Sequence, residues 1–311
     1  MRVILVGGGY WGSILSRVLC KCGHETVAEI NLPEDAARTI HTYAEMFSAD
    51  AAVIATPPET HAAIAIRALE CGLDVMVEKP MAMTPSDAIE IYNLAMENGC
   101  VLQVDSTFLH TQAFEYLRKL GVPKSYQSLR LANGPDHITT PAGWDLAVHD
   151  ISILCGLSAI SPGGSYVGRQ SADGKSATAS IKLNNGGQAH ILASRSWYQK
   201  ERSIVLRYEN ESYLWERDAL WRLVDEDRYL IGFELREVLE NVIDNFAARC
   251  KLRSLTGLTD GAHGVQVCIR LAEIFGVNNA VAKNSGNKVQ SGIGAMGQTM
   301  PGGDAVQHLQ L

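Results

Sequence analysis

No apolar run in the sequence approaches the ~18 residues that a membrane-spanning helix requires, and the N-terminus begins with the strand-like MRVILVG in place of a basic signal sequence. We therefore expect a cytoplasmic protein with no membrane partner. An excess of positive charge is also lacking, because 27 Lys and Arg residues stand against 34 Asp and Glu residues, a formal net charge of -7. With both signs interspersed, no basic face is offered to a phosphate backbone, and we expect no nucleic-acid partner.

Motifs for metal binding and hydrolysis are lacking as well. The chain has seven cysteines, but only Cys20 and Cys22 lie close together, and no second pair has metal-ligand spacing. We expect reduced thiols and no metal site. Neither H-E-x-x-H nor G-x-S-x-G occurs, which argues against metal-dependent hydrolysis and acyl transfer.

What the first hundred residues do contain is a regular alternation of short apolar strands and amphipathic helices. This alternation predicts an α/β domain with a doubly wound parallel sheet that has helices on both faces, the Rossmann arrangement. The last helix of this part has clear end signals, with Thr84 as N-cap and Pro85 at its first position. Strands are expected at 2–7, 25–30, 50–56, 74–78 and 101–106, and helices at 11–23, 33–47, 59–72 and 84–99.

Beyond about residue 120 the pattern changes to strand-like segments separated by turn signals, followed by two helices. It predicts an α+β domain with an antiparallel sheet. We assign 1–120 to a dinucleotide-binding domain, 121–275 to a substrate and oligomerisation domain, and 276–311, which lacks periodicity, to a flexible tail or arm. Strands are expected at 125–132, 176–183, 188–196, 202–208, 212–218 and 219–225, and helices at 233–250 and 259–275, the first with Leu235, Val238, Leu239, Val242 and Phe246 on one face.

The end of the first strand carries the pattern G-x-G-x-x-G at Gly7, Gly9 and Gly12. The pattern follows a strand and opens a helix, the context in which its glycines turn the chain, admit a pyrophosphate and allow close helix packing. The helix N-terminus would then face the phosphates with unpaired N–H groups. We therefore predict a bound dinucleotide; glycines that serve only a tight structural turn are the alternative.

The residue that would hold the ribose is less clear. The acid expected about 20 residues further on falls near Asn31, which is neutral and would not repel a 2′-phosphate. Glu29 is a possible substitute, although strand alternation can turn it to the wrong face, and Arg38 could approach a phosphate. The choice between NAD and NADP stays open.

The strand at 74–78 ends in Glu78, Lys79 and Pro80, an acid and a base side by side. Solvated charges at a strand tip are the simplest interpretation. Further on, Asp145 and His149 are four residues apart and share one face if this segment is helical. An imidazole, with an unperturbed pKa of about 6.5, can accept or donate a proton near neutral pH. His149 alone would more often be a structural histidine, but together with Asp145 and the upstream E-K-P it is a candidate acid/base.

Several motifs resemble the Gfo/Idh/MocA family of sugar and cyclitol dehydrogenases: GGGYWG, ATPPETH at 55–61, ALECGLDVMVEKP, and WDLAVHD at 144–150. The resemblance runs in order and spacing from residue 1 to about 275. GYWG, VDSTFLHTQAFEYLRKL and WDLAVHDISIL look most like the branch that acts on nucleotide-linked sugars and amino sugars.

The resemblance implies an open-faced mixed sheet after the Rossmann domain, pairing of these sheets into homodimers or homotetramers, and a cis bond before the proline of E-K-P. It implies catalytic roles for Lys79, beside the nicotinamide and the substrate hydroxyl, and for His149 as acid/base, with Asp145 orienting either group or binding a sugar hydroxyl. Asp150 is taken as structural. The expected cofactor-binding residues are Gly7, Gly9, Tyr10, Trp11, Gly12, Asn31, Ala55, Thr56, Pro57, His61, Glu78, Lys79 and Pro80. On likeness alone, Phe108, Asn133, Trp144 and Arg195 are expected to contact substrate, with Trp144 equally suited to the core.

We therefore predict an NAD(P)-dependent oxidoreductase that transfers a hydride between the nicotinamide and a secondary alcohol or ketone of a sugar derivative, nucleotide-linked sugars included. Two alternatives remain at this stage. One is a non-catalytic, dinucleotide-binding regulator of the same fold, and the other is a cyclitol or dihydrodiol dehydrogenase.

Overall fold

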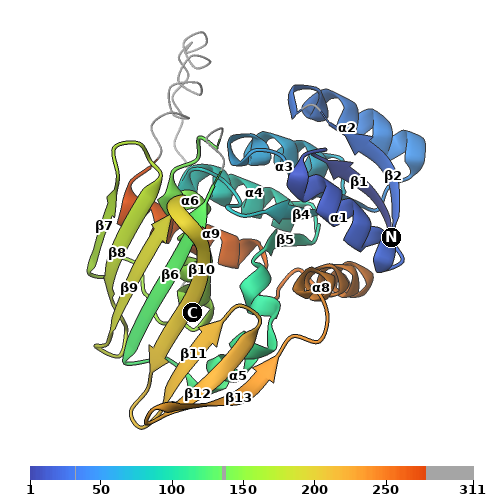
Figure 1. Ribbon diagram of the computed structural model, residues 1–311. Helices are drawn as coiled ribbons and strands as arrows, with labels where there is room; N and C mark the ends of the chain where they lie inside the picture. The colour runs from blue at the N-terminus through green and yellow to red at the C-terminus, as the bar shows by residue number, and fades with distance from the viewer. Residues whose placement is uncertain (32, 135–137, 278–311) are drawn as a thin grey trace, which may run out of the picture. The chain divides into compact units, whose positions relative to one another are not determined.

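Five parallel strands form the first sheet, in the order β2-β1-β3-β4-β5 (Figure 1). A computed structural model describes residues 1–31, 33–134 and 138–277 of the chain. Every side chain of β3 and β5 is buried, as expected for strands covered on both faces. The strand order reverses between β1 and β3, the point at which sheets of this type bind their ligands. The bounds are β1 Arg2–Val6, β2 Glu25–Ile30, β3 Ala51–Ile54, β4 Asp74–Glu78 and β5 Leu102–Asp105.

The connecting helices begin and end at the signals that the sequence provides. The hydroxyl of Thr84 accepts a hydrogen bond from the Asp87 backbone N–H at 3.1 Å and caps α4, whose first residue is Pro85. Gly72 and Gly99, which follow α3 and α4, have φ angles of +74° and +62°, and this left-handed conformation favours glycine. The bounds are α1 Tyr10–Lys21, α2 Pro33–Phe47, η1 Pro58–Thr60, α3 His61–Glu70 and α4 Pro85–Glu97.

The last two helices of the described chain, α8 (Val238–Leu252) and α9 (Gly261–Phe275), return to the first sheet. Val242 and Phe246 of α8 are fully buried in the cluster that α1 forms with β1 and β3, while Cys268 of α9 joins the cluster on the opposite face. The chain thus completes the layers of the first domain with its C-terminal helices. Of these two helices, the first was predicted to begin at residue 233. This start is wrong, because Glu237 caps α8 and Leu235, which is 79% exposed, lies before the helix.

The second sheet has the order β13-β12-β11-β10-β6-β9-β8-β7. Within the described ranges its one parallel pair is β6–β9, so the sheet is mixed and mostly antiparallel, as predicted. The two outermost strands, β7 and β13, were not predicted, because few of their side chains are buried and no apolar alternation marks them. The bounds are β6 Ser125–Asn133, β7 Tyr166–Gln170, β8 Ser176–Lys182, β9 Gln188–Ser194, β10 Ser196–Arg207, β11 Ser212–Glu216, β12 Ala219–Val224 and β13 Asp227–Phe233.

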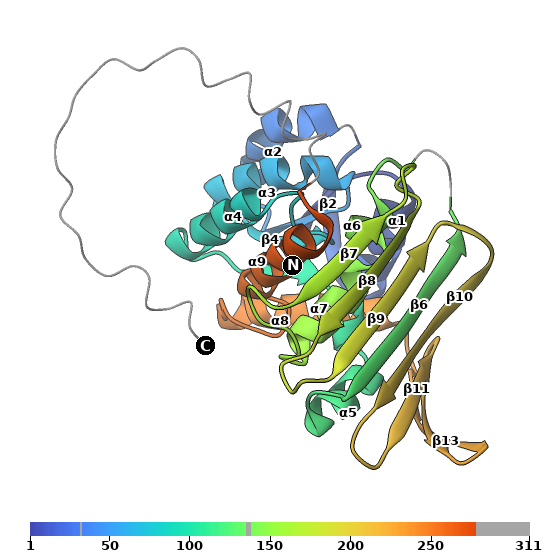
Figure 2. The same cartoon turned by 90° about the vertical axis from the view of Figure 1, so that its left-hand side faces the viewer.

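Helices lie against one face of this sheet, and Figure 2 shows its other face with no described helix over it. Asp150, fully buried on a helix, anchors that layer by accepting hydrogen bonds from Tyr126 at 2.7 Å and from Arg130 at 2.5 Å, both on β6. This agrees with the structural role expected for Asp150. The elements are η2 Thr107–His110, α5 Gln112–Leu120, α6 Ala142–Asp145 and α7 Val148–Gly156.

The described residues include no helix that is long and apolar enough to cross a membrane. All seven cysteines are free thiols. In the same part of the chain, no cluster of His, Cys, Asp and Glu side chains could hold a metal ion. Apart from Gly276 and Val277, the arm predicted at 276–311 lies outside the described residues.

Candidate active site

The glycine loop has the geometry that a dinucleotide requires. Gly7 has φ +113° and its backbone N–H donates to the Ile30 carbonyl at 2.8 Å, which turns the chain at the end of β1. A Cβ on Gly12 would collide with the Gly7 carbonyl oxygen, whereas one on Gly9 would meet no atom within 4 Å. Gly9 caps α1 without a side-chain hydrogen bond, and no acidic residue occupies the first turn. Free N–H groups, a positive helix end and open space over Gly9 fit a pyrophosphate.

The ribose end of this site contains Asn31, which follows β2 and whose amide oxygen lies over Gly8. Glu29 points elsewhere, because its carboxylate accepts a hydrogen bond from Ser16 of α1 at 3.2 Å. The side chain of Arg38 lies outside the described part of the structure. Asn31 is therefore the polar side chain that the described residues place at the tip of β2.

The loop after β3 is tied to the loop after β4. Thr60 donates to the hydroxyl of Thr56 and to the carbonyl of Pro57, each at 2.7 Å. His61 is fully buried, with Nε2 2.8 Å from the Thr56 carbonyl and Nδ1 2.9 Å from the Pro80 carbonyl. Burial lowers the pKa of His61. His61, expected at the cofactor, is thus packed between the two loops. Ala55 donates to the Val6 carbonyl at 2.8 Å and keeps this loop beside β1.

Tyr10 and Trp11 stand at the start of α1 and contact each other edge to face, with ring centroids 5.7 Å apart. Tyr10 is 77% exposed, whereas Trp11 lines a cavity of about 530 Å³ that also contains Lys79 and His149. Trp11 thus links the cofactor-side helix to the predicted catalytic residues.

Lys79 follows β4 directly, and the Lys79–Pro80 peptide bond is cis, as the resemblance predicts. Its ammonium group donates to the backbone carbonyl of Asp145 at 2.8 Å and to the Asp145 carboxylate at 3.0 Å. The other carboxylate oxygen of Asp145 accepts from Arg195 at 2.8 Å. Burial would raise the pKa of Asp145, but the charges and hydrogen bonds of Lys79 and Arg195 outweigh it and lower that pKa. Asp145 is therefore an ionised group that fixes the lysine.

His149 lies with Lys79 at the same cavity. Its ring packs edge to face against Phe108, with centroids 5.1 Å apart, and within the described residues its side chain has no hydrogen-bond partner. Burial first, and then the positive charges of Lys79, Arg130 and Arg202, hold the pKa of His149 well below its usual value. The imidazole is thus neutral at physiological pH and free to accept a proton.

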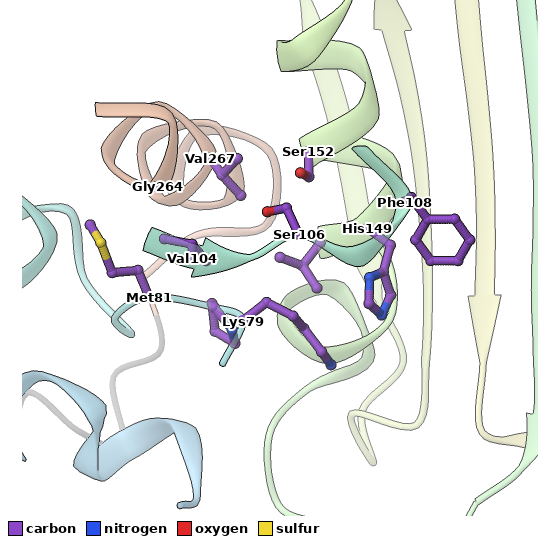
Figure 3. A pocket seen from close by; sticks show the side chains of 11 residues that line it. Lys79, Met81, Val104, Ser106, Phe108, His149, Ser152, Gly264 and Val267 are labelled. Atoms are coloured by element: carbon purple, nitrogen blue, oxygen red, sulfur yellow. The ribbon is translucent and has the colours of Figure 1, made fainter. Parts of the chain in front are cut away.

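Figure 3 shows Lys79, which follows β4, extending toward His149 of α7. Both residues and Phe108 line the large cavity and also a small one of about 10 Å³, into which the hydroxyls of Ser106 and Ser152 project. The small cavity has room for a single water molecule. The structure therefore brings together the predicted catalytic residues, although Asp145 and His149 do not share one helix as predicted: α6 ends at Asp145 and α7 begins at Val148.

Glu78 and Asp105 form a carboxyl pair at the adjacent ends of β4 and β5, where the parallel register places them side by side. Burial, and then the charge of Asp105, raises the pKa of Glu78 well above its ordinary value of 4.5. Burial also raises the pKa of Asp105. The two carboxyl groups share a hydrogen bond, and the direction of the shifts indicates that Glu78 holds a proton beside Lys79.

Three of the four residues expected to contact substrate do not line the large cavity. Trp144 is fully buried and donates from Nε1 to the Gly276 carbonyl at 3.1 Å, so it belongs to the core. Arg195 is 6% exposed, and its guanidinium donates hydrogen bonds to the Asp145 carboxylate and, at 2.7 Å, to the Thr140 carbonyl. Asn133 is exposed at the end of β6 and is not among the residues that line the large cavity. Phe108 does line it.

The sequence interpretation missed three charged residues of the site, Asp105, Arg130 and Arg202. Asp105 had a signal, because it ends the strand that follows Glu78 and neighbouring parallel strands end at one edge of a sheet. No pattern in the sequence marked Arg130 or Arg202 as part of the site. They meet across β6 and β10, two strands that are far apart in sequence.

Comparison with known proteins adds three findings. A family model described as an oxidoreductase family with an NAD-binding Rossmann fold, GFO_IDH_MocA, matches residues 1–106. UDP-N-acetylglucosamine 3-dehydrogenase of Acidithiobacillus ferrooxidans is 32% identical over 152 residues, which cover 47% of this chain and 49% of the relative. The match thus spans about half the length of this curated relative.

Two solved structures match over most of the chain. The structure of that Acidithiobacillus enzyme superimposes with a TM-score of 0.77 and 23% identity, covering 90% of this chain and 98% of the other. A levoglucosan dehydrogenase in complex with NADH superimposes with a TM-score of 0.69 and 15% identity, covering 91% and 97%. At these identities the two structures establish the two-sheet fold.

The difference between Gly7 and Gly9 makes the glycine loop testable. Gly9→Ala should lower the free energy of unfolding by no more than about 1 kcal/mol, since alanine is a poorer N-cap than glycine. It should weaken NADH binding by about tenfold or more, ~1.4 kcal/mol, because the new Cβ stands where the pyrophosphate must approach. Gly7→Ala should lower the free energy of unfolding by about 1–3 kcal/mol through backbone strain. Urea unfolding and NADH fluorescence titration measure the two effects. An unchanged NADH affinity in Gly9→Ala would contradict this site.

The carboxyl pair predicts a pH effect on stability. Unfolded chains ionise Glu78 above about pH 4.5 while the folded protein keeps it protonated, so this stability is complete below that pH and is lost as the pH rises through the raised pKa. Glu78→Gln stays neutral and can still donate to Asp105. Its Tm should therefore match the wild type near pH 4.5 and exceed it increasingly toward pH ~8.

Glu97→Gln, an exposed substitution on α4, provides the matched control and should show no such divergence. A Tm difference between Glu78→Gln and wild type that stays constant with pH would mean that Glu78 is ionised in the folded protein.

Proposed function

We propose that this chain, whose residues 1–106 match the Gfo/Idh/MocA oxidoreductase family model, is a dehydrogenase that transfers a hydride between a nicotinamide cofactor and a secondary alcohol or ketone of a sugar derivative. The observation that carries this proposal is the convergence of Lys79 and a neutral His149 on one cavity. An ammonium donor and an imidazole acceptor are the two groups that alcohol oxidation needs beside a hydride acceptor.

The cofactor would be held by the glycine loop, with Gly9 and the N-terminus of α1 at the pyrophosphate and Asn31 at the ribose. When bound, it supplies the hydride acceptor or donor. Because Asn31 is neutral, both NAD and NADP belong in the test.

Three side chains of this protein act on the substrate oxygen and its proton. Lys79, fixed by Asp145, donates a hydrogen bond to the substrate oxygen and stabilises the negative charge that develops there. His149 accepts the hydroxyl proton, and its lowered pKa keeps the imidazole unprotonated, and so available as a base, at neutral pH. In the reverse direction the same groups return the proton to a ketone.

The cavity supports a substrate of sugar size or larger. Its volume of about 530 Å³ lies within the ~300–1,000 Å³ usual for small-molecule sites. The printed function of the Acidithiobacillus relative, a UDP-N-acetylglucosamine 3-dehydrogenase, favours a nucleotide-linked sugar. We take that class as the first substrate to test.

We also propose that the protein pairs through the outer face of its second sheet. On β8 and β9 buried and exposed side chains alternate, so each strand has one face turned to solvent, and no described helix covers that face (Figure 2). Exposed Val167, Leu192 and Trp197 add apolar surface on these and neighbouring strands.

The proposed chemistry predicts the behaviour of two variants. With NAD or NADP and UDP-N-acetylglucosamine, N-acetylglucosamine or myo-inositol, at least one pair should produce reduced-nicotinamide absorbance. Lys79→Met and His149→Asn should each lower kcat by about 10²- to 10⁴-fold while NADH affinity is kept.

Lys119→Met and His41→Asn, two exposed residues outside both cavities, are the matched controls and should retain wild-type rates. Turnover that survives in Lys79→Met would contradict the mechanism. Cofactor binding without turnover of any alcohol would instead favour a regulator of the same fold.

A further inference from the structure

Two arginines face each other across the second sheet beside the catalytic cavity. Arg130 of β6 and Arg202 of β10 are direct partners in the antiparallel register. Arg202 lies on the inner face of β10, the face of the buried Ile204 and Leu206. Like charges directly opposite each other destabilise a sheet, so the arrangement requires a compensating negative charge on each side.

Only one of the two charges is compensated within the described residues. Arg130 binds the buried Asp150 with two hydrogen bonds, at 2.5 and 3.3 Å. Arg202 has no hydrogen bond and no ion pair from its side chain to any of residues 1–31, 33–134 and 138–277. Its guanidinium instead lies over the ring of Phe108, at 5.4 Å from the centroid, with that of Arg130 at 4.3 Å.

The nearby carboxylates do not supply the missing partner. Asp150 is occupied by Arg130 and Tyr126. The exposed Asp218 acts on the charge of Arg202 only at a distance, because no hydrogen bond or ion pair joins the two side chains within the described residues. Arg202 is half-buried, and burial together with the charge of Arg130 lowers its pKa. A partly desolvated guanidinium without an anion lowers stability. A planar guanidinium also matches the two oxygens of a carboxylate or phosphoryl group.

The position of Arg202 tells where such an anion would be. Arg202, Phe108 and His149 all line the large cavity, and Phe108 contacts both of the other two. The uncompensated charge therefore lies one side-chain layer from the proposed proton acceptor. It suits an anionic group on or next to the sugar ring that reacts, rather than one at a distant end of the substrate.

We propose that Arg202 is a specificity-determining residue that binds an anionic oxygen group of the substrate, a carboxylate on the sugar or a phosphoryl group attached to it. The inference rests on the proposed function for the place of the sugar in the cavity. It narrows the substrate class to acidic sugars, sugar phosphates or nucleotide-linked sugars and disfavours neutral sugars and cyclitols.

The test compares binding of four probes to the NADH-saturated protein by calorimetry: D-glucose, D-glucuronate, D-glucose 1-phosphate and UDP-N-acetylglucosamine. At least one anionic probe should bind about 10- to 100-fold more tightly than glucose, and Arg202→Gln should remove that preference. D-Glucuronate alone would identify a carboxylate site, whereas the other two would identify a phosphoryl site. Arg207→Gln, on the outer face of the same strand, should keep the wild-type preference.

A stability measurement separates ligand recognition from a structural role. Because Arg202 makes no hydrogen bond or ion pair within the described chain, Arg202→Gln should leave the Tm unchanged or raise it, whereas loss of a structural arginine would lower it. An equal preference for anions in wild type and Arg202→Gln, or no anion binding at all, would overturn the proposal.

The experiments distinguish failure of this proposal from failure of the proposed function. Anion binding that depends on Arg202 without any turnover would leave this site standing and remove the dehydrogenase. Turnover of glucose or inositol at wild-type rates in Arg202→Gln would support the dehydrogenase and contradict the anion site.

Discussion

The ion pair between Lys79 and Asp145 is the contact on which the site depends. Lys79 follows the central strand β4, while Asp145 ends the short helix α6 of the second domain, and Arg195 holds Asp145 from the far side. The lysine also bonds the Asp145 backbone carbonyl, so its position is fixed by two acceptors. Since each partner of such a triad is largely shielded from water, loss of one leaves the others uncompensated. The network thus orients the Lys79 amine, for which we propose a catalytic role, and joins the two sheets at the cavity.

The charges around this network explain how a lysine and a histidine can work together. His149 lies among Lys79, Arg130 and Arg202 and is kept neutral by burial and by those charges. Glu78 keeps a proton because Asp105 lies beside it in a buried position. The site therefore holds an uncharged base in positive surroundings, which suit both a developing alkoxide and an anionic substrate group. A substrate anion at Arg202 would reduce the positive potential at His149 and favour its protonation, as proton transfer requires.

The fold was predictable where local patterns decide it. The strand–glycine–helix sequence at Gly7 to Gly12, the Thr84 cap and the glycines after α3 and α4 each act within a few residues, and the first sheet followed from them. The return of α8 and α9 to that sheet was not predictable, because Phe246 and Cys268 are equally apolar whichever domain they cover. In the site, Lys79 and His149 could be proposed from the motifs that carry the resemblance. Arg202 could not be, since its role depends on a cross-strand partner and on the lack of a carboxylate bound to it among the described residues. The sequence could not decide between core and substrate contact for Trp144, and it misplaced Arg195, because sequence does not show burial.

The most direct test of this account is a double-mutant cycle between Lys79 and Asp145, measured on kcat with a substrate that the wild type oxidises. If Asp145 acts by holding Lys79, Asp145→Asn should slow turnover on its own but add little once Lys79→Met is present, and the double variant should be within about threefold of Lys79→Met. If the two losses multiply in the double variant, Asp145 contributes independently of the lysine, and the network described above is not the basis of the site.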